Sequence, residues 1–487
     1  MLWRRPMPTA ADRANRWALP LLIGGLVVGL VTRLVFAFQD DGLLWPDEYY
    51  QSLEPAHRAV FGYGWQAWEF LAGARHWTLP GFVAAVMKVS TALGFDYLRA
   101  VEITFCVAGA ATVLAIYRLA RAQDASPFAS AVGATTFALM GFAVYVAPRA
   151  MGESLSALPV TLAFAILCKP SSRAWLVVSG VLLTLAVGLR LQNGLFCLGA
   201  LGMLLAQRRP STPLGVNGDA GVNRDVLVLL GVLVLGALAY GAVDQLTWGA
   251  PFHSARQYLR FNVLEGRSSD FGTEPVFHYA RALVTTEGLT MVPLVALAAF
   301  GARGRPGVSL IALGFFLVHS FIPHKELRFI FPIIPLVCAQ AALGLDRVAA
   351  PRRMIVAATV LALAFASLAT FRTLTFWRLG ISNPSGELSA IDYAGPENRL
   401  LLRARTLTDL CGIKVASIEN WRTGGYAYLH QRVPFYRHEP AGAGDGHFNY
   451  VIAKRGSVTG TEIAIEADVA LIRLPTGCSP DLTYDWH

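Results

Sequence analysis

Charged residues are scarce in this sequence. Only 15% of its 487 residues are Asp, Glu, Lys or Arg, whereas 54% are hydrophobic. A soluble globular domain carries roughly 25% charged residues. The chain also lacks low-complexity tracts, and its six cysteines are few for its length. Intrinsic disorder, a secreted disulfide scaffold and an ordinary cytosolic enzyme are therefore poor fits. The composition predicts a polytopic membrane protein.

Acidic residues are fewer than basic ones, and the formal net charge is +9. A basic face on the folded protein would suggest nucleic-acid binding. The basic residues instead fall in short clusters between apolar runs, at Arg4-Arg5, Arg118/Arg121, Lys169/Arg173, Arg208-Arg209, Arg303/Arg305 and Arg347/Arg352/Arg353. This distribution is typical of cytoplasmic loops under the positive-inside rule. We therefore expect no nucleic-acid partner.

Membrane spans are predicted from apolar runs of about 20 residues. Eleven are predicted, near 17–38, 98–119, 127–146, 153–168, 174–190, 194–207, 226–245, 284–301, 308–323, 329–346 and 354–377. The first is expected to be an uncleaved anchor rather than a signal peptide, because it is too long and has no clear small-residue cleavage site. An odd number of spans places the chain ends on opposite sides, with the basic clusters inside. A first long loop (39–97), a second long loop (246–283) and the tail after 377 are then expected outside.

One apolar segment does not fit this topology as a span. Leu79–Gly94 is apolar enough to cross a membrane, but counting it would move the later basic clusters to the outside. We therefore expect a membrane-surface or half-buried helix within the first long loop.

The tail differs in character from the rest of the chain. Alternating runs at Lys414–Ile418, Tyr450–Lys454 and Val469–Leu474 predict strands separated by Gly/Pro turns. We expect a membrane domain over residues 1–378 and a small α/β domain over residues 379–487. Cys411 and Cys478 both lie in this tail, where a disulfide and two free thiols are equally compatible with the sequence.

Two adjacent carboxylates, Asp47 and Glu48, directly follow the first predicted span. Carboxylates held together at a membrane edge can supply a general base, since crowding and desolvation raise the pKa of one of them. The alternative is structural: Asp47 would cap a surface helix and Glu48 would fill its first turn. From these residues alone the structural alternative is somewhat favoured.

A second polar constellation lies between two short spans, at His324-Lys325-Glu326-Leu327-Arg328-Phe329. Cationic groups at the predicted outer face depart from the positive-inside rule, which suggests an anionic ligand such as a lipid phosphate. Snorkelling cations paired with lipid headgroups or with Glu326 are an equal alternative.

Weaker candidates for a substrate groove are polar residues near the predicted outer helix ends. Arg33 lies inside the first span and needs a partner, for which Asp40, Asp41 and the site itself are candidates. The others are Tyr49, Gln51, His57, Arg149, Glu153, Arg190, Gln192, Asn193, Arg256, Arg260 and Asn262. Each of these alone is more often structural than functional.

The sequence resembles family 22 glycosyltransferases. Pro-Asp-Glu-Tyr-Tyr-Gln-Ser-Leu-Glu-Pro-Ala-His at 46–57, Phe-Gly-Tyr-Gly at 61–64 and Trp-Glu at 68–69 are similar to the first outer loop of that family. His-Lys-Glu-x-Arg-Phe at 324–329 is similar to its second signature, and 261–264 resembles a loop of the glycosylphosphatidylinositol third-mannose transferases. The resemblance covers roughly residues 17–346.

The resemblance implies an all-α membrane enzyme of the GT-C type with a small C-terminal α/β domain. It implies transfer of mannose from a polyprenyl (dolichyl) phosphate to a hydroxyl of a lipid-linked glycan, on the outer face and with inversion to an α-linkage. In that pattern Asp47, with Glu48 beside it, matches the catalytic carboxylate. His324, Lys325 and Arg328 match the residues that would hold the donor phosphate. No metal cofactor is required, although a divalent ion at Asp47 and Glu48 is conceivable.

Two further expectations concern location and the competing class of protein. The composition, rich in Ala, Gly, Leu, Val and Arg, resembles chains from GC-rich genomes. We therefore expect a bacterial plasma-membrane enzyme whose site faces the periplasm; in a eukaryote it would lie in the endoplasmic-reticulum membrane. The alternative is a transporter or flippase of a lipid-linked or anionic substrate. Ionisable residues gathered at one membrane face favour the enzyme.

Overall fold

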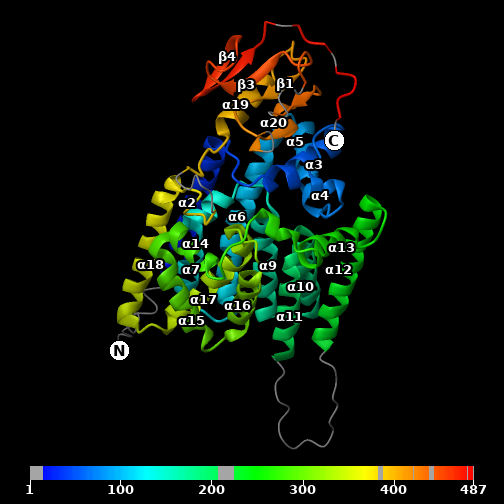
Figure 1. The fold of residues 1–487 in the computed structure, drawn as a ribbon. Coiled ribbons are helices and arrows are strands. Elements are labelled where there is room, and N and C mark those ends of the chain that lie inside the picture. The colour runs from blue at the N-terminus through cyan, green and yellow to red at the C-terminus, as the bar shows by residue number, and fades with distance from the viewer. Residues whose placement is uncertain are drawn as a thin grey trace, which may run out of the picture.

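The computed structural model describes residues 15–206, 224–381, 388–419, 422–437, 444–475, 477–479 and 481–485. Helices form a bundle, and a five-stranded sheet with two short helices sits over one end of it (Figure 1). We refer to this end of the bundle as the sheet end.

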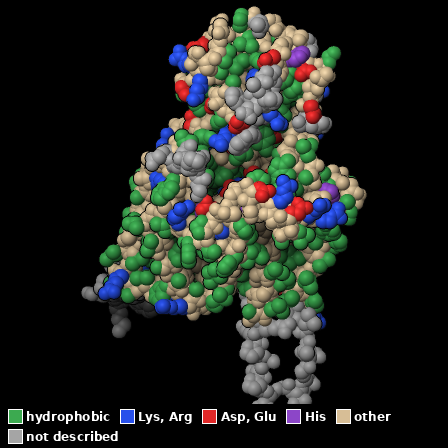
Figure 2. Space-filling view, in the orientation of Figure 1, with side chains coloured by type: hydrophobic (Ala, Val, Ile, Leu, Met, Phe, Trp, Pro, Cys, Tyr) green, Lys and Arg blue, Asp and Glu red, His purple; other side chains and the backbone are tan. Residues whose placement is uncertain are grey.

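Within the described residues, six helical segments are long and apolar enough to cross a membrane. They are α2 (Ala18–Gln39), α6 (Tyr97–Ala122), α12 (Arg224–Trp248), α14 to α15 (His278–Ala302), the 3-10 helix η6 with α17 (Leu327–Arg347), and α18 (Ala350–Thr370) with the 3-10 turn that follows it. Hydrophobic side chains cover much of the bundle in the view of Figure 2. The protein is therefore a multi-pass membrane protein.

Shorter apolar helices fill the rest of the bundle. They are α7 (Pro127–Leu139), α8 (Gly141–Val146), α9 (Gly152–Cys168), α10 (Arg173–Leu189), α11 (Gly194–Ala206) and α16 (Pro306–Phe321). Every predicted span falls on one or more of the helices described. Ser126 caps α7 by accepting a hydrogen bond from Ala129 N–H at 3.2 Å. The residues of α7 from Phe128 to Leu139 are all buried, so this helix lies at the centre of the bundle.

The first long loop contains four short helices at the sheet end. These are the π-helix η1 (Tyr49–Leu53), α3 (Glu54–Phe61), α4 (Trp68–Leu71) and α5 (Thr78–Ala92). α3 ends at Gly62, whose φ of 83° favours glycine. α5 covers the apolar segment Leu79–Gly94 except its last two residues, and it lies beside α3 rather than deep in the bundle (Figure 1). This position agrees with a surface helix, which stays a prediction.

The second long loop packs against the first. It contains α13 (His253–Leu259), the π-helix η3 (Arg260–Leu264) and the 3-10 turn η4 (Arg267–Phe271). A Cβ on Gly73 would lie 2.4 Å from Nε2 of His253, so the two loops touch at a position where only glycine fits. Trp248 Nε1–H donates a hydrogen bond to the carbonyl of Arg75 at 3.1 Å. The two long loops therefore form one continuous structure at the sheet end.

The C-terminal sheet has the strand order β2-β1-β3-β5-β4. The strands are β1 (Ile413–Val415), β2 (Phe435–Tyr436), β3 (Tyr450–Lys454), β4 (Thr461–Glu466) and β5 (Val469–Arg473), with helices α19 (Gly395–Ala404) and α20 (Gly425–Leu429). β1 pairs in parallel with β2 and β3, while β5 is antiparallel to β3 and β4. Cys411 and Cys478 form a disulfide.

The sheet part is fastened to the first long loop by buried polar contacts. Glu54 accepts hydrogen bonds from Ala427 N–H at 2.6 Å and Trp65 N–H at 2.9 Å. His57 Nε2 and His430 Nδ1 lie 3.0 Å apart. Burial raises the pKa of Glu54 to about 8 and lowers the pKa of His57 to about 3. These groups hold the loop that carries Asp47 against the sheet.

Candidate functional site

Asp47 sits where the chain leaves α2 and enters the π-helix η1. Pro46 precedes it, and its carbonyl accepts hydrogen bonds from the backbone N–H groups of Tyr49 at 3.1 Å and Tyr50 at 2.9 Å. π-helical turns occur often at functional sites. The helix that begins here has no side-chain cap bond from Glu48, and the side chain of Asp47 points to a distant arginine. The capping role considered from the sequence is therefore not what this carboxylate performs.

Arg328 is the arginine that holds Asp47. Its Nη2 lies 2.6 Å from Oδ2 of Asp47, and its Nε lies 2.7 Å from Oε2 of Glu326. A longer contact of 3.4 Å joins Nη1 to Oε1 of Glu153. The side chain of Arg328 is 2% exposed and that of Asp47 is 28% exposed. A buried guanidinium thus fixes a carboxylate that remains accessible.

The charges around Asp47 keep it ionised. Burial alone would raise the pKa of Asp47, but the guanidinium groups of Arg328, Arg75 and Arg190 together outweigh burial and hold this pKa below its usual range. Arg328 likewise lowers the pKa of Glu326 against the effect of burial. At neutral pH Asp47 is therefore a carboxylate that can accept a proton.

Glu48 faces a different arginine. Its Oε2 lies 3.0 Å from Nη1 of Arg149, and Nη2 of Arg149 lies 2.9 Å from Oδ2 of Asp40. The side chain of Glu48 is only 8% exposed, and burial raises its pKa even though Arg149 lowers it. The sequence suggested that the two adjacent carboxylates crowd each other in one site. In the structure they do not. Helical geometry turns successive side chains to different directions, and each finds its own partner.

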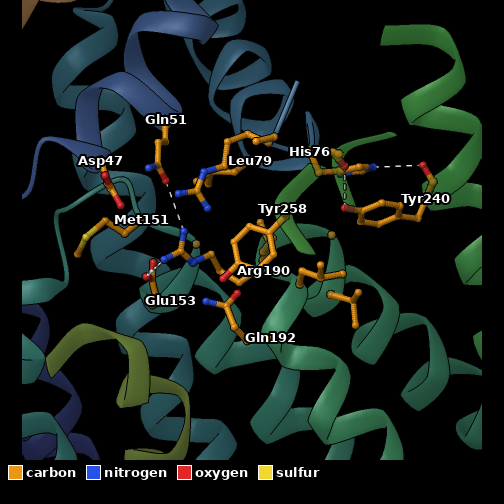
Figure 3. Close-up of a pocket in the computed structure, with 18 of the residues that line it drawn as sticks. Asp47, Gln51, His76, Leu79, Met151, Glu153, Arg190, Gln192, Tyr240 and Tyr258 are labelled. Carbon is orange, nitrogen blue, oxygen red and sulfur yellow. Dashed lines mark hydrogen bonds and ion pairs between the residues drawn. The ribbon is translucent and has the colours of Figure 1, made fainter. Parts of the chain in front are cut away.

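A cavity opens beside Asp47 between the two long loops and the ends of α9, α10 and α12. Figure 3 shows Asp47, Met151 and Glu153 on one side of it, Tyr240 on the other, and Arg190 and Tyr258 between them. The lining residues are Asp47, Gln51, Ala74, Arg75, His76, Leu79, Met151, Gly152, Glu153, Val187, Gly188, Leu189, Arg190, Leu191, Gln192, Tyr240, Ser254, Tyr258 and Arg328. The structure thus brings together Asp47, Gln51, Glu153, Arg190 and Arg328, five of the residues that the sequence analysis considered.

Two arginines other than Arg328 line this cavity. Arg190 pairs with Glu153 and donates to Oε1 of Gln51 at 3.4 Å. Arg75 lies over the ring of Tyr258, at 5.8 Å from the ring centre, and 3.7 Å from Oε1 of Glu69. The Nε of each arginine is buried and makes no hydrogen bond. Both residues line the cavity and place positive charge beside an anion bound there.

His324 and Lys325 do not line the cavity. Lys325 Nζ donates to the carbonyl of Glu274 at 2.7 Å, and His324 Nε2 lies 3.1 Å from Oε1 of Glu326. Burial lowers the pKa of His324, but Glu326 outweighs it and the net shift is upward. Of the three cations predicted in this motif, the structure brings only Arg328 to the carboxylate.

The remaining groove candidates lie elsewhere. Arg33 donates to the carbonyls of Gly29 at 2.8 Å and Ala138 at 2.9 Å, so neither Asp40 nor Asp41 is its partner. Tyr49 and His57 contact the sheet part through Tyr428 and His430, and Arg149 belongs to the Glu48 cluster. Arg256 and Arg260 contact His253 and Glu265, and the Asn262 side chain bonds the carbonyl of Tyr258.

Sequence reasoning missed Arg75, His76, Tyr240 and Asp244. His76 stacks on Tyr240 with ring centres 3.8 Å apart, and Asp244 Oδ2 accepts from Ser254 N–H at 2.8 Å. Two signals were available. Arg75 is a cationic residue, followed by a histidine, in a loop predicted to lie outside, and Asp244 is a charged residue inside a predicted span.

Groups able to bind a metal ion are not found among the described residues: no three His, Cys, Asp or Glu side chains come together in a suitable arrangement. Asp47 and Glu48, the pair considered for a divalent ion, are each bonded to a different arginine. The polar groups of the cavity are instead suited to hydrogen bonding and to binding an anion.

Comparisons with known proteins identify relatives. Residues 26–398 match the model of the Alg9-like mannosyltransferase family. GPI mannosyltransferase 3 of Yarrowia lipolytica is 28% identical over 331 residues, covering 65% of this chain and 61% of that protein. Alpha-1,2-mannosyltransferase alg9 of Schizosaccharomyces pombe is 27% identical over 62% of this chain and 54% of its own length. The chain thus spans less than two thirds of the length of these relatives.

Solved structures share the fold. ArnT from Cupriavidus metallidurans in the apo state matches with a TM-score of 0.58 at 13% identity, covering 96% of this chain and 100% of ArnT. The structure of ArnT bound to undecaprenyl phosphate matches with the same TM-score at 12% identity. The predicted fold class, a GT-C type helical membrane protein with a small C-terminal sheet, is therefore confirmed.

Proposed function

Because this chain belongs to the Alg9-like mannosyltransferase family, we propose that it transfers mannose from a polyprenyl-phosphate donor to a hydroxyl of a lipid-linked glycan. The reaction takes place on the outer face of the membrane and inverts the β-linked donor to an α-linked product. The observation that carries this proposal is the accessible Asp47 carboxylate, held by Arg328 in a cavity that also contains Arg75 and Arg190.

Asp47 is the general base. It accepts the proton of the acceptor hydroxyl while that oxygen attacks the anomeric carbon, on the face of the sugar opposite the phosphate. One glycosidic C–O bond forms as the bond between the anomeric carbon and the phosphate oxygen breaks. The products are the mannosylated glycan and polyprenyl phosphate, and the proton leaves Asp47 for solvent. Arg328 acts as a positioning residue, because it holds Asp47 and is itself nearly inaccessible.

Arg75 and Arg190 hold the donor phosphate in this mechanism. The phosphate gains negative charge as it leaves, and fixed cations aimed at that charge accelerate the step. The sequence pattern assigned this role to His324, Lys325 and Arg328, but His324 and Lys325 bond other groups and do not line the cavity. His324 supports Arg328 instead, since His324 bonds Glu326 and Glu326 bonds Arg328.

The lipid chain of the donor has a suitable neighbour. An apolar cavity lies between α10, α11, α12 and the start of α13, and it shares Val187, Leu191 and Tyr240 with the polar cavity. A donor phosphate at Arg190 would place its isoprenoid chain toward these apolar walls, where burial is favourable.

A metal ion is not needed for this chemistry, because the arginines supply the positive charge. The site faces the side of the membrane opposite the cytoplasm, which is the periplasm in a bacterium and the lumen in the endoplasmic reticulum. Donor, lipid-linked acceptor and membrane lipid are the expected partners.

The experiment is a transfer assay with purified protein in nanodiscs. Polyprenyl-phosphate mannose is the donor, and lipid-linked glycans extracted from the host are the acceptor. We expect a product that α-mannosidase degrades, no product from a nucleotide-linked mannose, and undiminished transfer in EDTA. Absence of transfer from any polyprenyl-phosphate sugar by folded protein would contradict the proposal and favour the transporter or flippase alternative.

A further inference from the structure

Aromatic rings from both long loops lie near the cavity. Tyr258 lines the cavity, and Phe261 follows three residues later in the π-helix η3. The ring centre of Phe261 lies 4.4 Å from that of Trp68, and the ring of Phe271 is nearly parallel to that of Trp68, 16° apart in plane at 6.3 Å. We call Tyr258, Phe261, Trp68 and Phe271 the ring track.

The outer rings of the track are unusually accessible for large aromatic side chains. Trp68 is 39% exposed and Phe271 is 57% exposed. Both belong to short helical segments, Trp68 to α4 and Phe271 to η4. Glu69, next to Trp68, is buried and accepts a hydrogen bond at 2.7 Å from Gln51, which lines the cavity. The rings therefore stand on the same rigid elements as the candidate site.

Charged groups frame the ring track. The guanidinium carbon of Arg267 lies 4.7 Å from the ring centre of Phe261, and Nε of Arg267 lies 3.4 Å from Oδ2 of Asp270. Arg260 pairs with Glu265 in the same loop at 2.7 Å. Figure 2 shows charged side chains gathered over this part of the sheet end, near α4 and α13. Charges this close to a ring surface disfavour insertion of that surface into hydrocarbon.

We propose that the ring track binds the glycan of the acceptor. A pyranose ring presents apolar C–H faces that can be buried against aromatic rings, and hydroxyl groups at its edge that can bond charged side chains. A chain of sugars lying on Trp68 and Phe271 would reach the cavity past Phe261 and Tyr258. The terminal hydroxyl would then meet Asp47. This inference rests on the proposed function, because it assumes that the acceptor is a glycan.

The test compares Trp68→Ala and Phe271→Ala with Phe277→Ala. Phe277 is a matched control, because it lies in the same loop and is 80% exposed but is not part of the track. Each protein is assayed in nanodiscs with polyprenyl-phosphate mannose and radiolabelled lipid-linked glycans extracted from the host. We measure KM for acceptor, KM for donor, kcat, and direct retention of the labelled glycan by protein without donor.

We expect Trp68→Ala to raise KM for the acceptor about tenfold and Phe271→Ala somewhat less, given what one aromatic contact contributes. KM for donor should stay unchanged, and Phe277→Ala should behave as the wild type. Glycan retention equal in Trp68→Ala and Phe277→Ala would overturn the inference whether or not transfer occurs. Equal losses in the track and control variants that vanish in detergent would show that the rings contact lipid, and would also overturn it. If the wild type retains the glycan but transfers nothing, the proposed function fails while the track stands.

Discussion

Asp47 and Glu48 are neighbours in the chain, yet they lie in two regions of opposite character. Each pairs with an arginine, at 2.6 Å for Asp47 with Arg328 and 3.0 Å for Glu48 with Arg149. The Asp47 region opens to a cavity, and its arginine lowers the pKa of the carboxyl. The Glu48 region is more enclosed, with its side chain 8% exposed against 28% for Asp47, and burial raises the pKa of the Glu48 carboxyl despite its arginine. Asp47 and Glu48 therefore differ in how accessible their side chains are, and not in whether they pair with an arginine.

This difference identifies which carboxylate can do chemistry. A reacting hydroxyl must come within about 3 Å of its base, and of the two carboxylates Asp47 is the more accessible, at 28% exposed against 8% for Glu48. A buried pair such as Glu48 with Arg149 adds little stability but fixes geometry, because each charge would be costly to leave alone. We therefore regard the Glu48 region as the rigid support and the Asp47 region as the reactive site.

Substitution of Asp47 by Asn should have the largest effect. Loss of a general base lowers kcat by about 10²–10⁴-fold, and we expect roughly 10³-fold for Asp47→Asn in the transfer assay. The amide preserves shape and can still accept a hydrogen bond from Arg328, so binding of the donor should remain within about threefold of the wild type. Retained turnover in Asp47→Asn would show that another group removes the proton.

Replacement of Arg328 by Lys should lower kcat about 10²-fold, because displacement of a reacting group by about 1 Å has that consequence. A single ammonium cannot hold Glu326 and Asp47 in the two-sided way that the guanidinium does. The ammonium of Arg328→Lys should stabilise the Asp47 carboxylate less than the guanidinium does, so the pKa of Asp47 should rise. The acid limb of the pH–rate profile should then shift to higher pH than in the wild type. An unshifted limb would contradict the role of Arg328 in setting this pKa.

Loss of the guanidinium at position 190 should act on the donor. Hydrogen bonds to a charged group contribute roughly 1.5–3 kcal/mol, so Arg190→Gln should raise KM for polyprenyl-phosphate mannose about tenfold or more. Arg281→Gln is the control, since Arg281 is a cation of the second long loop, 45% exposed, and pairs loosely with Glu274 at 3.8 Å. A donor KM unchanged in Arg190→Gln would remove Arg190 from the phosphate site.

The sequence was sufficient for the bundle and for the approximate site. Apolar runs of spanning length identify helices without knowledge of their partners, and adjacent carboxylates after a span are conspicuous. The partition between Asp47 and Glu48 could not be predicted, because it depends on Arg328 and Arg149, which lie 281 and 101 residues away in the chain. Tertiary contacts of this range leave no local pattern.

Charge alone was also a poor guide to which cations face the cavity. Lys325 was assigned to a phosphate because it is a cation at the predicted outer face, but its ammonium donates hydrogen bonds to backbone carbonyls. Arg75 occupies the cavity wall and carried the same signal in the first long loop. In the tail, three strands were predicted near their observed positions, while β2 and β4 were missed. The residues of β4 do not alternate, because Ile463, Ala464 and Ile465 follow one another. The position of β4 at the sheet edge leaves it mostly exposed, which weakens the hydrophobic signal.

Glu48→Gln should have the smallest effect on turnover, within about threefold, and it tests the other half of the comparison. Burial raises the pKa of Glu48 in the folded protein, so the folded state holds this proton more tightly than the unfolded state. The stability that this contributes is complete below the usual carboxyl range and is lost as pH rises through the raised pKa. Glutamine does not titrate. The melting temperature of Glu48→Gln in detergent should therefore fall less between pH 5 and 8 than that of the wild type.

The pH dependence of stability has the opposite sign for Asp47, because its lowered pKa makes stability fall as pH decreases. In Asp47→Asn the melting temperature should therefore fall less at acid pH than in the wild type. If the melting temperatures of the two variants depend on pH in the same way, both carboxyls have the same surroundings. That result would contradict the distinction between the two regions.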